Sequence, residues 1–165
     1  MLRASTGGGS ERSSIASPIK VCALVHERGL IDTSVLIELE GIDITDLPAE
    51  LAISSVTLAE LAAGPHATDD PDERARRQDR LERAQALFDP LPFARDEARA
   101  YGRVYAAVRS AGRKARGRRL ADLLIAATAV AADLPIYTRN PKDFGGLEKL
   151  LEIVPVKRTA SPRRT

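Results

Sequence analysis

Short apolar runs alternate along this chain with longer segments of helical periodicity, and no other feature of the sequence limits the fold as strongly. Runs of strand character lie at 30–35, 51–53, 91–93, 134–138 and 153–156. The intervening segments are long enough for helices, so we expect helical crossovers between parallel strands. The sequence therefore predicts an α/β domain with a Rossmann-like parallel sheet of about five strands and helices on both faces.

Capping residues and apolar faces locate the predicted helices. The first two strands are expected to lead into helices that end at Gly41 and Gly64. Two aspartates before Pro71 favour a mostly charged surface helix over 69–88. Its apolar face comprises Leu81, Ala84, Leu87 and Phe88. Asp96 is predicted to cap the next helix. The nearly all-apolar segment 120–134 is predicted to be the most buried helix.

Length and composition indicate one domain. With 165 residues, 44% of them hydrophobic, the chain can bury a substantial core. Residues 1–20 are rich in Ser and Gly and have no apolar period, so we expect them to form a disordered extension. The domain is then expected over 21–157, with a basic, flexible tail over 158–165.

The counts of cysteine and histidine exclude several classes of protein. The single cysteine, Cys22, cannot form an intramolecular disulfide, and two histidines without further thiols cannot make a structural zinc site. No apolar stretch reaches the roughly 18 residues that a membrane-spanning helix needs, and the first residues lack the apolar core of a signal peptide. We therefore expect a cytoplasmic protein without membrane association.

Four acidic residues share a place in this pattern of strands and helices. Asp32 lies where the first strand passes into its helix, and Glu60 lies in the helix after the second strand. Asp122 lies near the start of the buried helix, and Asp143 follows the fourth strand. The carboxyl ends of parallel strands lie along one edge of a sheet, where ligands bind. The four carboxylates are therefore predicted to converge at that edge.

Each of these acids also has an ordinary structural explanation. Asp32 and Asp143 would cap helices, Glu60 would complete a capping box with Thr57, and Asp122 would favour the positive end of a helix dipole. Together, however, four anions would repel one another and raise some of their pKa values unless a cation neutralised them. Oxygen ligands without a nearby His or Cys select a hard ion, Mg²⁺ or Mn²⁺, and two such ions can hydrolyse a phosphodiester.

The segments around the four acids resemble, in order and spacing, the acidic motifs of VapC toxins, which are PIN-domain proteins. These segments are 31–36 (IDTSVL), 54–61 (SSVTLAEL), 122–129 (DLLIAATA) and 138–144 (TRNPKDF). The resemblance covers about residues 29–156. It implies a PIN-like fold and an Mg²⁺-dependent endoribonuclease. The implied catalytic and metal-binding residues are Asp32, Glu60, Asp122 and Asp143, and the implied supporting residues are Thr138 and Asn140.

The same resemblance implies the partners of this chain. It implies single-stranded or looped RNA, often tRNA, as the substrate, a homodimer, and inhibition by a VapB-type antitoxin encoded alongside. We expect the antitoxin to place an arginine or lysine where a metal would lie, because a guanidinium can bind paired carboxylates. An amphipathic segment of the antitoxin would fill a groove between the helical stretches 36–39 and 58–61.

Basic residues crowd the segment that leads into Asp122. We predict that they bind RNA phosphates on either side of the cut, because cationic side chains hold a nucleic acid through its phosphates. The predicted RNA-binding residues are Arg113, Lys114, Arg116, Arg118 and Arg119. Aromatic residues make up only 4% of the chain, so base stacking is not expected to be the main mode of recognition.

Three other interpretations are weighed against this one. A catalytically silent PIN-like RNA-binding domain would keep the fold without the chemistry, although all four acids are present. A metal-dependent DNA nuclease would use the same site, because the ions act on the phosphate and need no 2′-OH. A phospho-accepting signalling domain, with Lys157 as its lysine, is disfavoured because the strand at 91–93 has no acceptor aspartate at its tip.

Overall fold

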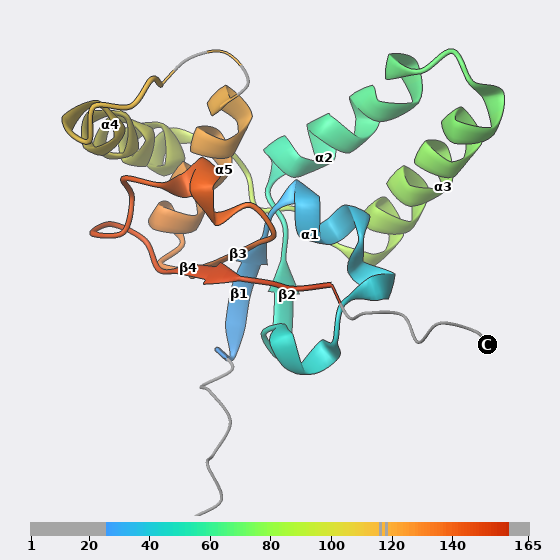
Figure 1. Ribbon diagram of the computed structural model, residues 1–165, viewed down its shortest axis with the longest axis horizontal. Helices are drawn as coiled ribbons and strands as arrows, with labels where there is room; N and C mark the ends of the chain where they lie inside the picture. Colours follow the sequence, from blue (N-terminus) through green and yellow to red (C-terminus); the bar gives the residue numbers. More distant parts are fainter. Residues whose placement is uncertain (1–25, 116, 118, 159–165) are drawn as a thin grey trace, which may run out of the picture.

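A computed structural model of the chain describes residues 26–158 apart from 116 and 118 (Figure 1). The predicted extension 1–20 lies outside the described residues, as do 159–165 of the predicted tail and both Arg116 and Arg118. The elements, in chain order, are β1 (Arg28–Ile31), α1 (Thr33–Ile37), η1 (Leu39–Gly41), η2 (Ile44–Asp46), β2 (Glu50–Ala52), α2 (Ser55–Ala63), η3 (Gly64–Ala67), α3 (Pro71–Leu87), α4 (Arg95–Ser110), α5 (Arg119–Ala131), β3 (Ile136–Thr138), η4 (Pro141–Phe144) and β4 (Ile153–Pro155), where η denotes a short 3-10 helix.

The strands of the described chain form one four-stranded parallel sheet in the order β2-β1-β3-β4. In β1, Leu30 lies opposite Ala52 of β2 and Ile136 of β3. This arrangement confirms the predicted parallel α/β fold. The predicted strand at 91–93 contributes a single bridge, between Leu91 and Ser54, because the neighbouring segment turns into α2 at Ser55.

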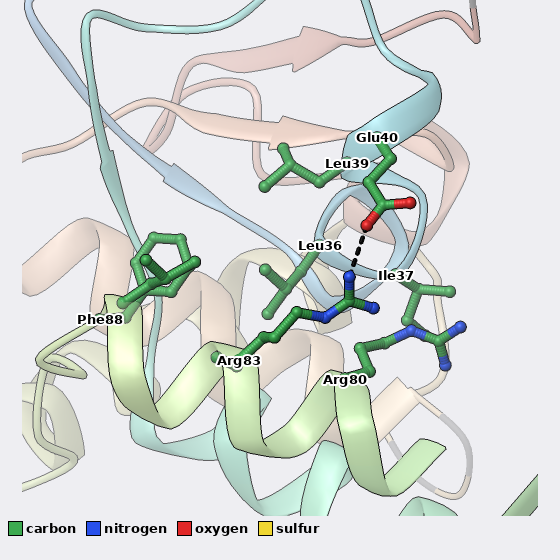
Figure 2. A pocket seen from close by; sticks show the side chains of 9 residues that line it. Leu36, Ile37, Leu39, Glu40, Arg80, Arg83 and Phe88 are labelled. Carbon is green, nitrogen blue, oxygen red and sulfur yellow. Dashed lines mark hydrogen bonds and ion pairs between the residues drawn. The ribbon is translucent and has the colours of Figure 1, made fainter. Parts of the chain in front are cut away.

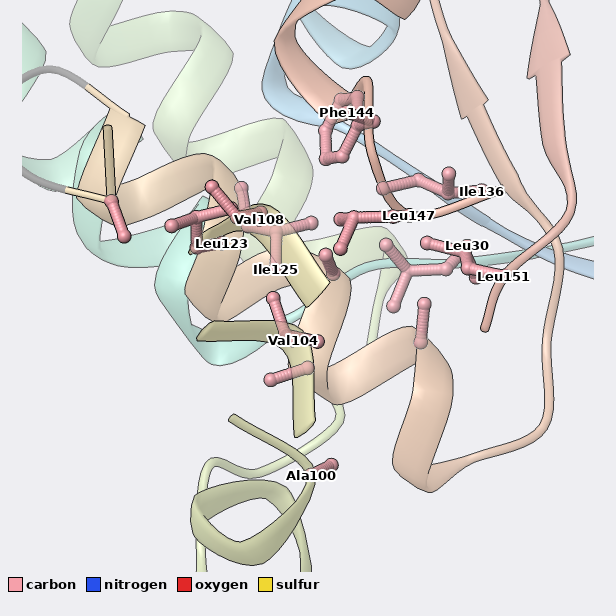
Figure 3. Close-up of a cluster of buried hydrophobic side chains, with 14 residues drawn as sticks. Leu30, Ala100, Val104, Val108, Leu123, Ile125, Ile136, Phe144, Leu147 and Leu151 are labelled. Carbon is pink, nitrogen blue, oxygen red and sulfur yellow. The ribbon is translucent and has the colours of Figure 1, made fainter. Parts of the chain in front are cut away.

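Helices cover both faces of the sheet, as predicted. Successive residues of a strand point to opposite faces, and neighbouring residues of β1 and β3 accordingly enter two different cores. Leu30 and Ile136 pack in one core with side chains of α4 and α5 (Figure 3). Ile31 and Tyr137 pack in a second core with side chains of α1, α2 and α3. In Figure 1, α4 and α5 accordingly lie on one side of the sheet and α3 lies on the other.

Two of the predicted helices begin and end close to their expected limits. α5 contributes the most buried residues of any helix, but it ends at Ala131 rather than at 134. α3 begins after Asp70, whose carboxylate accepts hydrogen bonds from the main-chain N–H groups of Asp72 and Glu73. Leu81 and Ala84 of its apolar face are buried. Leu87, predicted to lie on the same face, is 74% exposed because it is in the last turn, beyond the packed part of the helix.

Two local predictions are wrong for reasons of capping. The first strand, expected to continue to residue 35, ends at Ile31 because the carboxylate of Asp32 caps α1. Asp96 does not cap α4, since that helix starts one residue earlier, at Arg95. Its N-cap residue is Ala94, whose N–H donates to the carboxylate of Glu97 at 2.8 Å. Among the described residues, no helix combines the length and the apolar character needed to cross a membrane.

Candidate active site

Asp32 lies directly after β1 and is almost fully buried, with 5% of its surface exposed. Its Oδ1 accepts hydrogen bonds from the Val35 N–H at 2.9 Å and the Ser34 hydroxyl at 2.7 Å. Its Oδ2 accepts a hydrogen bond from the Thr138 hydroxyl at 2.6 Å. The carboxylate therefore caps α1 with one oxygen and points the other toward the end of β3.

The ends of β1 and β3 are joined by a network of hydroxyl groups. Thr138 Oγ1 accepts from the Asn140 N–H at 2.9 Å, and Ser34 Oγ accepts from the Arg139 N–H at 3.1 Å. Of the two predicted supporting residues, Thr138 thus contacts Asp32 directly, whereas Asn140 enters the network through its main chain. Ser34 was missed by the sequence analysis, although its place two residues after an acid at a strand end could have indicated a contact of this kind.

Glu60 lies in the interior of α2, and its side chain is exposed. The hydroxyl of Thr33, at the start of α1, donates a hydrogen bond to the Glu60 carboxylate. The N-cap of α2 is Ser54, whose hydroxyl accepts from the Thr57 N–H at 2.9 Å. The capping box considered for Thr57 and Glu60 is therefore absent from α2, and capping does not account for Glu60.

Asp122 lies in the first turn of α5, and its pKa is raised from 3.8 to about 7. Burial is the largest cause, followed by the negative charges of Asp143, Glu60 and Asp32, while the positive charge of Arg119 acts in the opposite direction. A helix dipole alone would lower this pKa. The raised pKa therefore reflects burial first, together with the other three carboxylates, which lie close enough to act on Asp122.

Asp143 lies in η4, the short helix that follows β3. The N-cap of η4 is Asn140, whose main-chain carbonyl accepts from the Asp143 N–H at 2.9 Å. Asp143 is thus inside the helical turn and does not cap it. Helix capping therefore explains neither Glu60 nor Asp143.

The chemistry of these four side chains fits a hard divalent cation. All of their donor atoms are oxygens, and their mutual repulsion would be relieved by positive charge. Within the described part of the chain, however, no three His, Cys, Asp or Glu side chains are already grouped as ligands of one ion. Glu60 is bonded to Thr33, and Asp32 is bonded to three donors. Binding an ion would therefore require some of the carboxylates to rotate toward a common point.

The basic segment that leads into α5, together with the first residue of that helix, contacts the helix that carries Asp143. Nη2 of Arg113 donates to the main-chain carbonyl of Lys142 at 2.6 Å, and Nη2 of Arg119 donates to the main-chain carbonyl of Asp143. Lys114 is exposed. Two of the residues predicted to bind RNA are thus engaged with the protein itself, which the sequence could not indicate because the contact joins segments far apart in the chain.

An apolar pocket lies between α1, η1 and α3 (Figure 2). Leu36 and Leu39 line one side, and Ala84 and Phe88 line the other. At the rim, the Arg83 guanidinium donates to the Glu40 carboxylate at 2.6 Å. A second pocket lies where a groove was predicted between 36–39 and 58–61: Ile37 lines it from α1, and Glu60 and Leu61 line it from α2.

A parallel sheet of this order, with acids at its carboxyl edge and helices on both faces, is the fold of a PIN domain, and residues 29–149 match the family of that description. Ribonuclease VapC5 of Mycobacterium tuberculosis is 37% identical over 123 residues, which are 73% of this chain and 87% of that protein. Ribonuclease VapC of Rickettsia bellii is 32% identical over 133 residues, 78% of this chain and 97% of that protein.

The solved structures agree with these relatives. The crystal structure of VapBC-5 from Mycobacterium tuberculosis, a member of the VapBC family of toxin–antitoxin systems, has a chain that superposes with a TM-score of 0.69 at 36% identity. The match covers 79% of this chain and 99% of that chain. The present chain therefore belongs to the VapC family of PIN-domain proteins.

Proposed function

We propose that this chain is a metal-dependent endoribonuclease and the toxin of a type II toxin–antitoxin pair. The observation that carries the proposal is the set of four acids at the carboxyl edge of the sheet, where the charges of Asp143, Glu60 and Asp32 add to burial in raising the pKa of Asp122. Its relatives in Mycobacterium tuberculosis and Rickettsia bellii are named ribonucleases, which supports RNA as the substrate. The substrate class is single-stranded or looped RNA, with tRNA as the leading candidate.

Asp32, Glu60, Asp122 and Asp143 are the residues that would hold Mg²⁺, or Mn²⁺ in its place. When bound, two such ions supply an activated water and stabilise the leaving oxygen of the phosphodiester. Thr138 and Ser34 orient the Asp32 carboxylate through their hydroxyls. Thr33 donates a hydrogen bond to Oε2 of Glu60, which leaves Oε1 as the oxygen that would bind a metal.

The proposed partner is a VapB-type antitoxin that covers the acidic edge. A structural relative of this chain, VapBC-5 from Mycobacterium tuberculosis, belongs to the VapBC family of toxin–antitoxin systems, which supports such a partner. An amphipathic helix of the antitoxin would lay its apolar side chains against Leu36 and Phe88 in the pocket of Figure 2. A homodimer in the cytoplasm completes the proposal.

Cleavage assays with the purified full chain test this function. The substrates are tRNA, a single-stranded RNA and the DNA oligonucleotide of the same sequence, each with Mg²⁺, Mn²⁺ or excess chelator. We expect the RNA to be cut at discrete sites and only with a divalent ion. Asp122→Asn should abolish cleavage, whereas Asp133→Asn, which alters an exposed acid in the loop between α5 and β3, should not.

Two results would overturn the proposal. Binding of RNA without cleavage under every metal condition would identify a catalytically silent RNA-binding domain. Faster cleavage of DNA than of RNA would identify a DNA nuclease. Sequencing of RNA 5′ ends after brief induction of the unaltered protein and of Asp32→Asn would identify the RNA that is cut in the cell.

A further inference from the structure

Two arginines from the basic segment bind the main chain of η4, the helix that carries Asp143. The Lys142 carbonyl, which accepts from Arg113 at 2.6 Å, otherwise has only a long hydrogen bond of 3.3 Å, from the Gly145 N–H. Arg119 donates to the carbonyl of Asp143 itself. A helix this short leaves most of its carbonyls without a partner of its own. The two guanidinium groups therefore supply donors that η4 lacks.

A pair of glycines makes room for this contact. A Cβ atom added to Gly145 would lie 2.4 Å from Nη1 of Arg113, and one added to Gly146 would lie 2.9 Å from the Cβ of Ala111. Gly146 also has a φ of 93°, a conformation that favours glycine. The close approach of residues 111–113 to η4 thus depends on the absence of side chains at 145 and 146.

Arg119 also acts on Asp122, which lies three residues later in α5. Its positive charge lowers the pKa of Asp122, against the larger effects that raise that pKa. The Nε atom of Arg119 is buried and has no acceptor among the described residues. Arg119 therefore binds the main chain of Asp143, influences the carboxylate of Asp122, and keeps one buried donor for an oxygen atom at this site.

We propose that Arg113 and Arg119 are positioning residues for Asp143, which hold η4 by its carbonyls and so keep the fourth carboxylate in place for a divalent cation. The proposal rests on the proposed function as a metal-dependent nuclease. It differs from phosphate binding, because the bonded oxygens belong to the protein. Outer contacts that orient metal ligands typically change metal affinity by roughly 10–100-fold when they are removed.

Gly145→Ala tests the positioning of Asp143 without changing the charge of the protein. The added methyl group displaces Arg113 from η4 but leaves every arginine in the chain. Gly102→Ala is its matched control, since a Cβ at this exposed helical position would meet nothing within 4 Å. Arg119→Gln removes the second contact, and Arg103→Gln removes a charge from an exposed residue of α4 as its control. Arg119→Lys keeps the charge. A lysine has a single nitrogen, so it cannot bind the Asp143 carbonyl and also offer a second donor in a fixed position, as the guanidinium does.

Two measurements are made on the full chain without RNA. Titration calorimetry gives the affinity for Mn²⁺, and hydrogen exchange in metal-free buffer follows the main-chain amides of 142–147. We expect Gly145→Ala and Arg119→Gln to weaken Mn²⁺ binding by about tenfold or more and to speed exchange in η4. Arg119→Lys should remain weakened, and both controls should match the unaltered protein. With RNA and saturating Mn²⁺, the two variants should lower kcat more than they raise KM.

Unchanged Mn²⁺ affinity in Gly145→Ala and Arg119→Gln would overturn the proposal, whether or not exchange in η4 becomes faster. Full recovery of affinity in Arg119→Lys would also overturn it, because charge alone would then suffice. If the unaltered protein neither binds Mn²⁺ nor cuts RNA, the proposed function fails separately. The exchange of η4 amides then decides whether the arginines hold this helix, since that readout needs no metal.

Discussion

The Thr138 hydroxyl joins the ends of two neighbouring strands by donating a hydrogen bond to Oδ2 of Asp32 at 2.6 Å, across 106 residues of sequence. Thr138 is the last residue of β3, and Asp32 directly follows β1. The chain leaves β1 toward β2 on one side and returns through β3 on the other. Strand order reverses at this point, which is where ligands bind in open α/β sheets. The bond fixes the first acid of the candidate site at that position.

Replacement of Thr138 tests the importance of this bond. Thr138→Val keeps the shape of the side chain but leaves the buried Asp32 Oδ2 and the Asn140 N–H without their partner. We expect a loss of about 1–3 kcal/mol in the free energy of unfolding and a higher Mg²⁺ requirement for RNA cleavage. Thr138→Ser keeps the hydroxyl and should retain most of the activity. Denaturant unfolding and Mg²⁺ titrations of cleavage measure both effects. Equal Mg²⁺ requirements for the Val and Ser variants would contradict this role.

The raised pKa of Asp122 makes the stability of the metal-free protein depend on pH. Between pH 4 and its pKa of about 7, the folded chain holds a proton that the unfolded chain has released. The contribution of Asp122 to stability therefore falls as the pH rises through this window and then levels off. Mg²⁺ should restore stability at pH 8, because it neutralises the same charge.

Melting temperatures at pH 5 and pH 8 measure this contribution. Asp122→Asn should melt at a higher temperature than the unaltered protein at pH 8 without metal, and it should gain less from Mg²⁺. Asp133→Asn should follow the unaltered protein under all conditions. If the melting temperature of Asp122→Asn decreases from pH 5 to pH 8 by as much as that of the unaltered protein, another group controls this dependence.

Replacement of Lys114 tests RNA binding without disturbing the four acids at the edge of the sheet. Its side chain is exposed, so we expect Lys114→Gln to leave the melting temperature and Mn²⁺ affinity unchanged. The KM for RNA should rise, and the slope of log affinity against log salt should become smaller by about 1. Arg103→Gln, which removes a charge elsewhere, is the control. Equal effects of the two variants on KM would indicate a general effect of net charge.

The two most exposed large apolar side chains of the described residues provide a test of antitoxin docking. Leu87 lines the apolar pocket and is 74% exposed, whereas Ile44 lies in η2 and is 82% exposed. Both Leu87→Glu and Ile44→Glu should fold normally. Only Leu87→Glu should weaken binding of the protein encoded by the neighbouring gene, measured by calorimetry.

A second part of this test concerns the metal. If the antitoxin places a cationic side chain among the carboxylates, high Mg²⁺ should weaken its binding, and Asp122→Asn should reduce that dependence. Equal affinity at low and high Mg²⁺ would mean that inhibition works through a surface away from the acids.

The sequence was sufficient to predict the features that are repeated along the chain. The alternation of strands and helices, the burial of α5 and the capping of α3 by Asp70 follow from local composition and spacing, and the structure contains all three. The approach of the four acids could also be predicted, because parallel strands bring their carboxyl ends to one edge. The roles of these acids as metal ligands remain predictions.

Features that depend on contacts between distant segments could not be predicted. Arg113 and Arg119 are close to Asp122 in sequence and resemble phosphate ligands, but they bind carbonyls of a helix more than 20 residues away. The strand at 91–93 had the right apolar pattern, yet its pairing ends where the neighbouring segment turns into α2 at Ser55. Ser34 and Thr33 belong to the site only because α1 begins beside β3 and α2.

The position of β1 in the sheet has a consequence for synthesis on the ribosome. β1 is among the first described segments to leave the exit tunnel, but its neighbour β3 is made about 100 residues later, and Asp143 later still. Contacts so distant in sequence form slowly, because a long loop must close first. A chain still attached to the ribosome therefore exposes Asp32 without β3 beside it. Under the proposed function, the nascent protein cannot cut RNA near the ribosome that makes it until the residues up to Asp143 have left the tunnel.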